Sequence, residues 1–294
     1  MRIGLLFLAA LGFINASFAQ GVGKTIDFSS PVFKIKDLPE IEDELNAEFF
    51  SNNRDRLRDT LPDSSMVVLF SAPLKSKSND IDFRFNQDPD FYYFTGIDAP
   101  NAIMVIFKSP VQLNGEWVRE ALYLEERDQK KEQWTGKMLS VEQAKEISKA
   151  QLVFPNTSFK TTSFPWDRIH EVFTNAHDHI ERDDKEHPGD LKSMVFHFDA
   201  KVKRAGIQPK ANEGEDLFAY LRQKKTTDEI AMIQRAVDIT CEAQRNAIKS
   251  MKAGMTEYQI EAIINYTFRS MGSQGEAFPT IVASGENGAI MHYT

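Results

Sequence analysis

The stretch Met66-Val67-Val68-Leu69-Phe70 (MVVLF) is an unbroken apolar run of the length of a β-strand. Turn-forming residues, Pro62 to Ser65, precede it, and a polar loop follows it from Ser71 to Asp80. A strand with one exposed face alternates apolar and polar side chains, whereas a strand covered on both faces reads as a continuous apolar run. We therefore predict a strand at residues 66–70 that is buried on both faces of a sheet.

Similar runs recur along the chain, with helical patterns before, between and after them. The further strands that we predict cover Ala102–Phe107, Ala121–Leu124 and Leu152–Phe154. The helices that we predict in the same region cover Ile41–Thr60, Ser140–Ala150 and Phe164–Ile180. Strands that alternate with helices are typical of an α/β domain, so the sequence predicts that fold class.

The stretch from Phe83 to Phe107, FRFNQDPDFYYFTGIDAPNAIMVIF, is rich in aromatic residues and has a turn at Thr95-Gly96. Such rings could form a platform for a ligand or could pack against the sheet. We favour packing, because large aromatic side chains dominate the cores of folded domains.

A long amphipathic helix is predicted after residue 226. Thr226 and Glu229 have the spacing of a capping box, in which each side chain satisfies a free backbone N–H at a helix start. Residues that recur every three or four positions predict one buried face of this helix: Ile230, Ile233, Val237, Cys241, Gln244, Ile248 and Met251. Gly254 closes the helix.

A second amphipathic helix follows, and Thr256 and Gln259 repeat the capping-box spacing at its start. Its apolar positions are Ile260, Ile263, Ile264, Phe268 and Met271. The polar residues 198–216 precede both helices and contain glycine and proline. We place a domain boundary there, between residues 205 and 206.

The segment Ile281–Thr294 reads IVASGENGAIMHYT. Asn287-Gly288 is a strong tight-turn signal, because both residues tolerate positive φ. Two short apolar runs joined by this turn predict a β-hairpin or a strand–loop–strand unit. Side chains alternate along a strand, so we expect Ile290 and His292 on one face. From the residues alone, His292 is either a structural histidine or an acid/base candidate.

Composition is that of a globular protein: 41% of the 294 residues are hydrophobic and 27% are charged. The formal net charge is −8 and no basic stripe is present, which argues against nucleic acid as a partner. The single cysteine, Cys241, excludes an intramolecular disulfide. It has no histidine near it in sequence, so we interpret it as a small core residue rather than a nucleophile.

Residues 1–19 predict a signal peptide. Arg2 gives a positive start, an apolar run extends from Ile3 to Ile14, and Ser17-Phe18-Ala19 offers a cleavage site after Ala19. The run is too short for a membrane span. We expect an exported protein, periplasmic or secreted, with no span in the mature chain; an uncleaved N-terminal anchor is the alternative.

Three short motifs fail as catalytic or metal sites. Ser284-Gly285 lacks the preceding glycine of a nucleophile elbow, and the glycines at 285 and 288 lack the G-K-[ST] ending of a phosphate loop. His177-Asp178-His179 lies in a highly charged stretch, and residues two apart do not share a helix face. We interpret this histidine pair as solvated surface, and the residues themselves predict no metal ligand.

Four stretches resemble the aminopeptidase P, or Xaa-Pro aminopeptidase, family of pita-bread metallopeptidases in the family's order and at similar spacing. They are FRFNQDPDFYYFTGIDAP (Phe83–Pro100), ERDQKKEQWTG (Glu126–Gly136), LRQKKTTDEIAMIQRAVDIT (Leu221–Thr240) and TIVASGENGAIMHYT (Thr280–Thr294). The third of these stretches is also similar to prolidases and other pita-bread enzymes.

The resemblance implies a creatinase-type α/β domain at residues 20–205 and the first part of a pita-bread catalytic domain at residues 206–294. It implies an enzyme that removes the N-terminal residue from peptides with proline at the second position, using two metal ions, typically manganese. It also implies roles for two residues. His292 lines the substrate site and assists proton transfer, and Trp134 reaches toward a neighbouring subunit's active site in a homo-oligomer formed through the N-terminal domains.

The family's metal ligands follow the HYT motif, whereas the sequence as written stops at Thr294. We therefore expect the 294 residues alone to be catalytically inactive, as a truncated or incomplete gene product. Two alternatives stay open. One is a non-catalytic pita-bread-like module that binds peptides or proteins, and the other is a prolidase, which differs in the length of its substrate.

Overall fold

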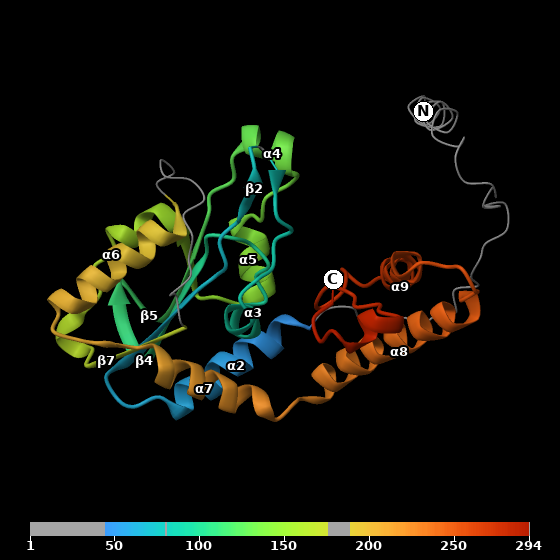
Figure 1. The fold of residues 1–294 in the computed structure, drawn as a ribbon. Coiled ribbons are helices and arrows are strands. Elements are labelled where there is room, and N and C mark those ends of the chain that lie inside the picture. Colours follow the sequence, from blue (N-terminus) through green and yellow to red (C-terminus); the bar gives the residue numbers. More distant parts are fainter. Residues whose placement is uncertain (1–44, 80, 176–188, 294) are drawn as a thin grey trace. The chain divides into compact units, whose positions relative to one another are not determined.

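The computed structural model describes residues 45–79, 81–175 and 189–293 (Figure 1). Contacts divide the chain into two compact units: Ile41–Met232 forms one, and Ile233–Thr294 belongs to the other. The expected signal peptide lies outside the described residues, and the boundary expected at residues 205/206 stays a prediction. Within the described ranges, no helix combines the length and apolar character that a membrane span requires.

The first unit is built on one mixed sheet. Among the described residues, six strands form it in the order β6-β5-β4-β1-β7-β8. The strands are β1 (Ser65–Phe70), β4 (Ile103–Leu113), β5 (Glu116–Leu124), β6 (Leu152–Pro155), β7 (Glu171–Thr174) and β8 (Pro209–Lys210). β1 pairs antiparallel with β4 and parallel with β7, so it lies inside the sheet. The four predicted strands and the α/β class are confirmed.

Every residue of β1 is buried, as the unbroken apolar run predicts. Val67 and Leu69 face one hydrophobic core, whereas Met66, Val68 and Phe70 face another. The first core also receives side chains from α2 (Ala47–Thr60), α3 (Pro89–Thr95), α5 (Val141–Ser148) and α7 (Ala211–Gln223). The second receives side chains from the 3₁₀ helix η1 (Asn156–Lys160) and from α6 (Leu191–Arg204). The sheet is thus covered on both faces.

The aromatic-rich stretch mostly packs, as we favoured. Phe91 and Phe94 of α3 are fully buried, and the ring of Phe94 contacts Phe218 of α7 edge to face. Gly96 ends α3 at φ 69°, a left-handed conformation that glycine adopts without strain. A separate ribbon of β2 (Ser76–Ser78) and β3 (Ile81–Asp82) precedes α3 and is exposed.

The helix predicted at Phe164–Ile180 is wrong for the residues that the structure describes. A short 3₁₀ helix, η2 (Trp166–Arg168), is followed directly by strand β7. Val172 and Phe173 in β7 are buried, and β7 pairs in parallel with β1. Pro165 and the β-forming Val-Phe-Thr run favour this outcome, because a free position beside β1 stabilises an extended chain more than local helical spacing stabilises a helix.

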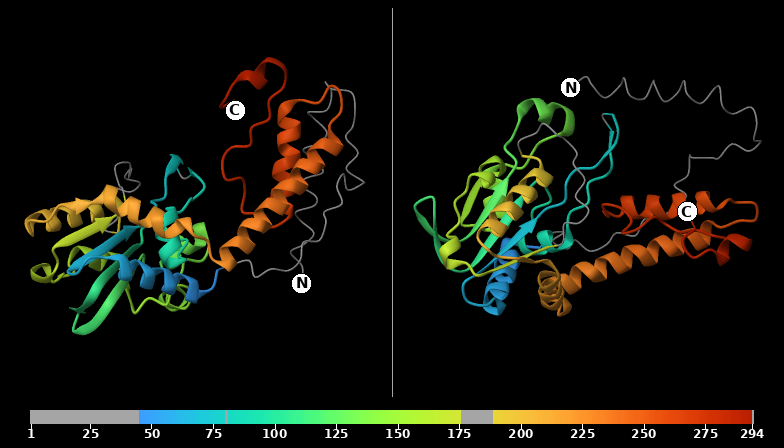
Figure 2. Two further views of the ribbon diagram at one scale, coloured as in Figure 1. Left: turned by 90° about the horizontal axis from the view of Figure 1, so that it is seen from below. Right: turned by 60° about the vertical axis from the view of Figure 1, so that its left-hand side comes forward.

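Helix α8 (Thr227–Ser250) begins in the last residues of the first unit and belongs to the second unit from Ile233 on, where α9 (Glu257–Ser270) lies against it in both views of Figure 2. The capping box predicted at the start of α8 is present, since the Glu229 carboxylate accepts a hydrogen bond from the Thr226 N–H at 2.8 Å. The capping box of α9 is present as well. Their shared core contains Ala243 and Ala247.

The buried face predicted for α8 is wrong. Ile230, Ile233, Val237, Ile248 and Met251 are exposed, and so is Cys241. The buried residues of α8 are instead Ile239, Glu242, Ala243, Asn246 and Ala247, of which Ala243 and Ala247 pack with Ile260 and Ile264 of α9. Small alanines let two helices approach closely, and the Asn246 amide donates to the Thr267 hydroxyl of α9 (3.4 Å). Periodicity identified an apolar stripe, but the described residues leave that stripe uncovered.

Candidate functional site

The segment that carries His292 is a loop. Residues 281–293, all of them described, contain the 3₁₀ turn η3 (Gly285–Ala289) and no strand. The predicted hairpin is therefore wrong, and so is the expectation that Ile290 and His292 share a strand face. A strand needs a neighbour to accept and donate its backbone hydrogen bonds, and no described strand pairs with this segment. Asn287 and Gly288 lie within η3, but neither has the positive φ on which the turn prediction rests; the glycine with positive φ in this loop is Gly285, at 54°.

One carboxylate on α9 holds this loop. Glu257 Oε1 accepts hydrogen bonds from the Ser284 backbone N–H at 2.5 Å and from the Ser284 hydroxyl at 2.9 Å. The Asn287 amide donates to both carboxylate oxygens, at 3.2 and 3.1 Å. The Tyr293 hydroxyl donates to Glu257 Oε2 at 2.7 Å. Both ends of the segment 284–293 are therefore attached to the first turn of α9.

These hydrogen bonds keep Glu257 ionised. The donors on Tyr293, Asn287 and Ser284 lower the pKa of the Glu257 carboxyl to about 2, because they stabilise its charged form. The same contact raises the pKa of the Tyr293 hydroxyl, since the phenol donates its proton to a carboxylate. The network is thus complete at neutral pH. His292 itself, next to Tyr293, is exposed to solvent.

Trp134 lies in the first unit, on the short helix α4 (Gln129–Thr135), and is 88% exposed. No residue of α4 is buried, so core packing does not fix the helix. Its start is capped by the Asp128 side chain, which accepts from the Lys130 N–H at 2.8 Å. Its end is formed by Gly136 at φ 89°, a conformation that favours glycine.

Ion pairs fix α4 instead. The Arg127 guanidinium donates twice to the Glu132 carboxylate, at 2.6 and 3.0 Å, and the Met138 N–H donates to the same carboxylate at 3.0 Å. These hydrogen bonds lower the pKa of Glu132. Lys131 of α4 pairs with Glu125 at 2.7 Å. The E-x-W-x-G motif therefore combines an anchoring carboxylate, an exposed tryptophan and a glycine that ends the helix with positive φ.

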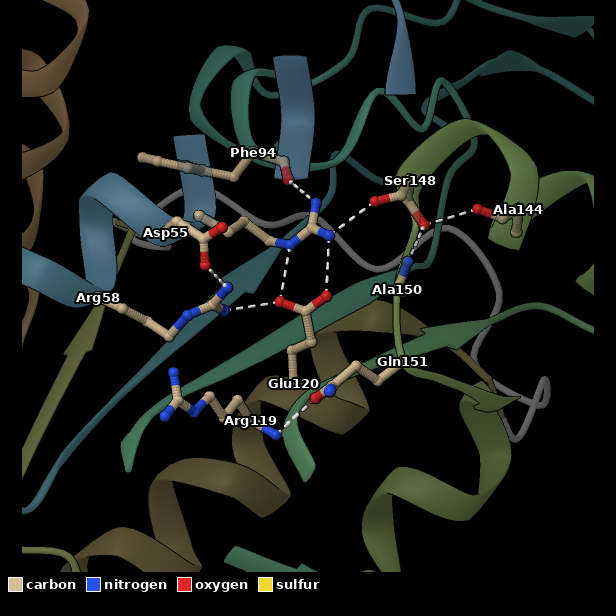
Figure 3. Close-up of polar contacts among 10 residues, drawn as sticks. Asp55, Arg58, Phe94, Arg119, Glu120, Ala144, Ser148, Ala150 and Gln151 are labelled. Atoms are coloured by element: carbon tan, nitrogen blue, oxygen red, sulfur yellow. Dashed lines mark hydrogen bonds and ion pairs between the residues drawn. The ribbon is translucent and has the colours of Figure 1, made fainter. Parts of the chain in front are cut away.

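Among the described residues, the most buried charged cluster lies elsewhere in the first unit (Figure 3). The fully buried Arg54 of α2 donates to both oxygens of Glu120 in β5, at 3.0 and 2.8 Å. It also donates to the carbonyl oxygens of Phe94 and Ser148, at 2.8 and 2.7 Å. Arg58 adds a third donor to Glu120 at 2.7 Å. Burial alone would raise the pKa of Glu120, but the two guanidinium groups outweigh it and lower that pKa.

Every charge in this cluster has partners, so its geometry is that of a structural link between α2, α3, α5 and β5 rather than of a reactive centre. The sequence offered no signal for it, because Arg54 and Glu120 lie far apart in the chain. Among the residues that the structure describes, no group of three or more histidine, cysteine, aspartate or glutamate side chains could hold a metal ion.

Comparison with known proteins decides what these elements belong to. Residues 50–165 match the family model for the aminopeptidase P N-terminal domain, and residues 231–294 match that of metallopeptidase family M24. The chain is 28% identical over 253 residues to the Xaa-Pro aminopeptidase of Escherichia coli, covering 85% of this chain and 55% of that protein.

The chain belongs to the aminopeptidase P family.

Solved aminopeptidase P structures share its fold. A Bacillus anthracis structure assigned as an aminopeptidase P is 31% identical, with a TM-score of 0.70 over 85% of this chain and 57% of that one. The E. coli aminopeptidase P with the inhibitor Pro-Leu is 25% identical, with a TM-score of 0.71 over 85% and 55%. Human Xaa-Pro aminopeptidase 3 is 26% identical, covering 77% of this chain and 43% of that protein.

The chain spans about half the length of the aminopeptidase P relatives it matches. The metallopeptidase family implies divalent metal ions. The side chains in the described parts of this chain do not form a site that fits such an ion, so we derive no reaction step through a metal. The two residues singled out by resemblance belong to different units: Trp134 to the first and His292 to the second.

Proposed function

We propose that this chain supplies the N-terminal domain and the beginning of the catalytic domain of an Xaa-Pro aminopeptidase. Such an enzyme removes the first residue from peptides that have proline in second position. The observation that carries the proposal is the succession of the two family matches, at residues 50–165 and 231–294. Relatives that are named Xaa-Pro aminopeptidases match the chain across both regions, which supports it.

His292 is the residue that we propose for proton transfer. The bond before proline has no N–H, so its cleavage depends on a donor that can protonate the leaving nitrogen or assist at the carbonyl. Imidazole is suited to this because it can hold or release a proton near neutral pH. The exposure of His292 at the end of an anchored loop leaves the ring accessible to a substrate.

Trp134 is the residue that we propose for substrate contact. Its ring is 88% exposed on a helix held by ion pairs, so it can contact a second molecule without any rearrangement of the core. We propose that this second molecule is a neighbouring subunit of a homo-oligomer formed through the first unit, so that the ring borders that subunit's substrate site.

The cofactor that we propose is manganese. As the resemblance to the family implies, we also propose that the 294 residues by themselves are inactive. We also propose export of the protein, on the basis of the signal-like residues 1–19.

The experiment compares two samples. One is the 294-residue chain expressed alone, and the other is the protein captured from its source cells with an antibody raised against residues 45–175. Both receive Mn²⁺ and a tripeptide with proline in second position, and release of the first amino acid is measured by chromatography. We expect release by the captured protein and none by the expressed chain.

Further measurements on the same samples distinguish the proposed enzyme from its alternatives. A tripeptide with alanine in place of proline should be resistant, and preferential cleavage of an Xaa-Pro dipeptide would indicate a prolidase instead. Binding of peptides without any cleavage by the captured protein would indicate a non-catalytic binding module. Turnover by the 294-residue chain alone would contradict its expected inactivity.

A further inference from the structure

Four donors converge on the carboxylate of Glu257: the backbone N–H and hydroxyl of Ser284, the amide of Asn287 and the hydroxyl of Tyr293. They come from both ends of the loop 284–293. Asn287 and Tyr293 are also linked directly, since the Asn287 amide donates to the Tyr293 hydroxyl at 2.9 Å. The Glu257 side chain thus links both ends of the loop that carries His292.

The loop has little else to hold it. Its residues are exposed, apart from half-buried Asn287 and Tyr293, which are the ones bonded to Glu257. Val282, just before it, packs partly against the core of α8 and α9. Among the described residues, no other side chain outside the loop makes a hydrogen bond to it. Without Glu257, we expect the position of His292 to be set by flexible backbone alone.

Glu257 is not needed to start α9. Thr256 and Gln259 already form the capping box, in which the Gln259 side chain accepts from the Thr256 N–H at 2.9 Å. Glu257 lies in the first turn, where the positive end of the helix dipole favours a carboxylate. A carboxylate accepts on both oxygens and donates nothing, which suits four converging donors. The residue is therefore available to hold the loop.

We propose that Glu257 is the positioning residue for His292, fixing the loop 284–293 on α9 so that the imidazole has one defined location. The proposal rests on the proposed function in one respect only, which is that His292 acts on substrate. Tyr293 transmits the constraint, because it is bonded to Glu257 and is adjacent to His292 in the chain. Glu257 does not touch the reacting atoms and acts only through the loop.

The first test needs no activity. We record the imidazole C–H signals of the 294-residue chain by NMR, and His292→Gln identifies the signal of His292. We expect that signal to differ from its random-coil position in the parent chain and to move to that position in Glu257→Ala. Hydrogen exchange of peptides covering 281–293 should accelerate by about tenfold or more, with exchange in α8 unchanged.

Glu286→Gln is the matched control, because it removes a charge from an exposed residue of the same loop that makes no hydrogen bond to α9. It should leave both readouts as in the parent. Tyr293→Phe removes one of the hydrogen bonds to Glu257 without changing α9, so it tests the same contact if Glu257→Ala disturbs that helix. It should move the His292 signal part of the way to its random-coil position. A His292 signal at the random-coil position in the parent, or one unmoved by both Glu257→Ala and Tyr293→Phe, would overturn the proposal.

The second test uses the active protein captured from the source, in which Glu257→Gln is introduced at the gene. Positioning predicts a fall in kcat of about tenfold or more with KM nearly unchanged, because proton transfer is misplaced while binding is kept. Unchanged kcat with a displaced His292 signal would refute the positioning role. If the parent protein cleaves no Xaa-Pro peptide, the proposed function fails, whereas the NMR result still decides whether Glu257 fixes His292.

Discussion

Replacing Glu120 by alanine should cost the protein about 3–5 kcal/mol of unfolding free energy, which is typical of breaking one side of a buried ion pair. Glu120 is only 4% exposed and accepts three hydrogen bonds, two from Arg54 and one from Arg58. Its removal leaves the guanidinium of Arg54, which is fully buried, without a counter-charge. The carbonyl oxygens of Phe94 and Ser148 still accept from Arg54, but they carry no net charge.

The assay is urea unfolding of the 294-residue chain, followed by circular dichroism and by tryptophan fluorescence. Glu116→Ala is the control, because Glu116 lies on the same strand but is exposed, and it should change stability by about 0.5 kcal/mol or less. Arg54→Met should cost a similar amount to Glu120→Ala. The double variant should cost less than the sum of the two, because they break one interaction. A loss below about 1 kcal/mol for Glu120→Ala would refute the reasoning.

Three further outcomes are expected. Gly96→Ala should destabilise by at least about 1 kcal/mol in the same urea assay, because Gly96 has φ 69° and an added Cβ would collide with the ring of Phe50; a neutral result would contradict this. The pKa of Glu120 is lowered from 4.5, so its contribution to stability is complete above that value and is lost as pH falls through the lowered pKa; in urea unfolding measured from pH 7 downward, the stability difference between Glu120→Ala and the parent should stay constant above pH 4.5 and narrow only below it. Trp134→Ala should change stability by no more than about 0.5 kcal/mol, since the ring is exposed, yet should raise KM for Xaa-Pro peptides in the captured protein.

The sheet could be predicted from the sequence because its strands are local signals. The run 66–70 is apolar at every position, and only a strand covered on both faces accommodates that pattern. Strand β7 was missed because its residues also fit a helical spacing. These residues form a strand because they pair with the free edge of β1. That edge exists only once the sheet has assembled, so local sequence does not report it.

The same limit explains the errors in the second unit. An apolar stripe on α8 marks a face suited to burial, but it does not identify which element covers it. In the residues that are described, α9 packs against the alanine-containing face instead. The hairpin expected at 281–294 has no neighbouring strand among the described residues, and the backbone hydrogen bonds of a strand cannot be completed without one.

The sequence identified the two exposed candidate residues, His292 and Trp134. It did not identify the carboxylates that fix the segments carrying them. His292 and Trp134 were singled out through motifs that are contiguous in the chain. Glu257 contacts Ser284, Asn287 and Tyr293 across a chain separation that no local pattern reports. Glu132 lies within the E-x-W-x-G motif, but its pairing with Arg127 becomes visible only once α4 is formed.

The most direct test of the central claim is the kcat of His292→Ala, measured on a tripeptide with proline in second position. The parent is the protein captured from its source, with Mn²⁺ added, and metal content is determined in both samples. We expect cleavage by the parent and a loss of about 10²–10⁴-fold in the variant, the range for removal of a proton-transfer group, with metal content unchanged. Absence of cleavage by the parent, or a variant within twofold of it, would contradict the account.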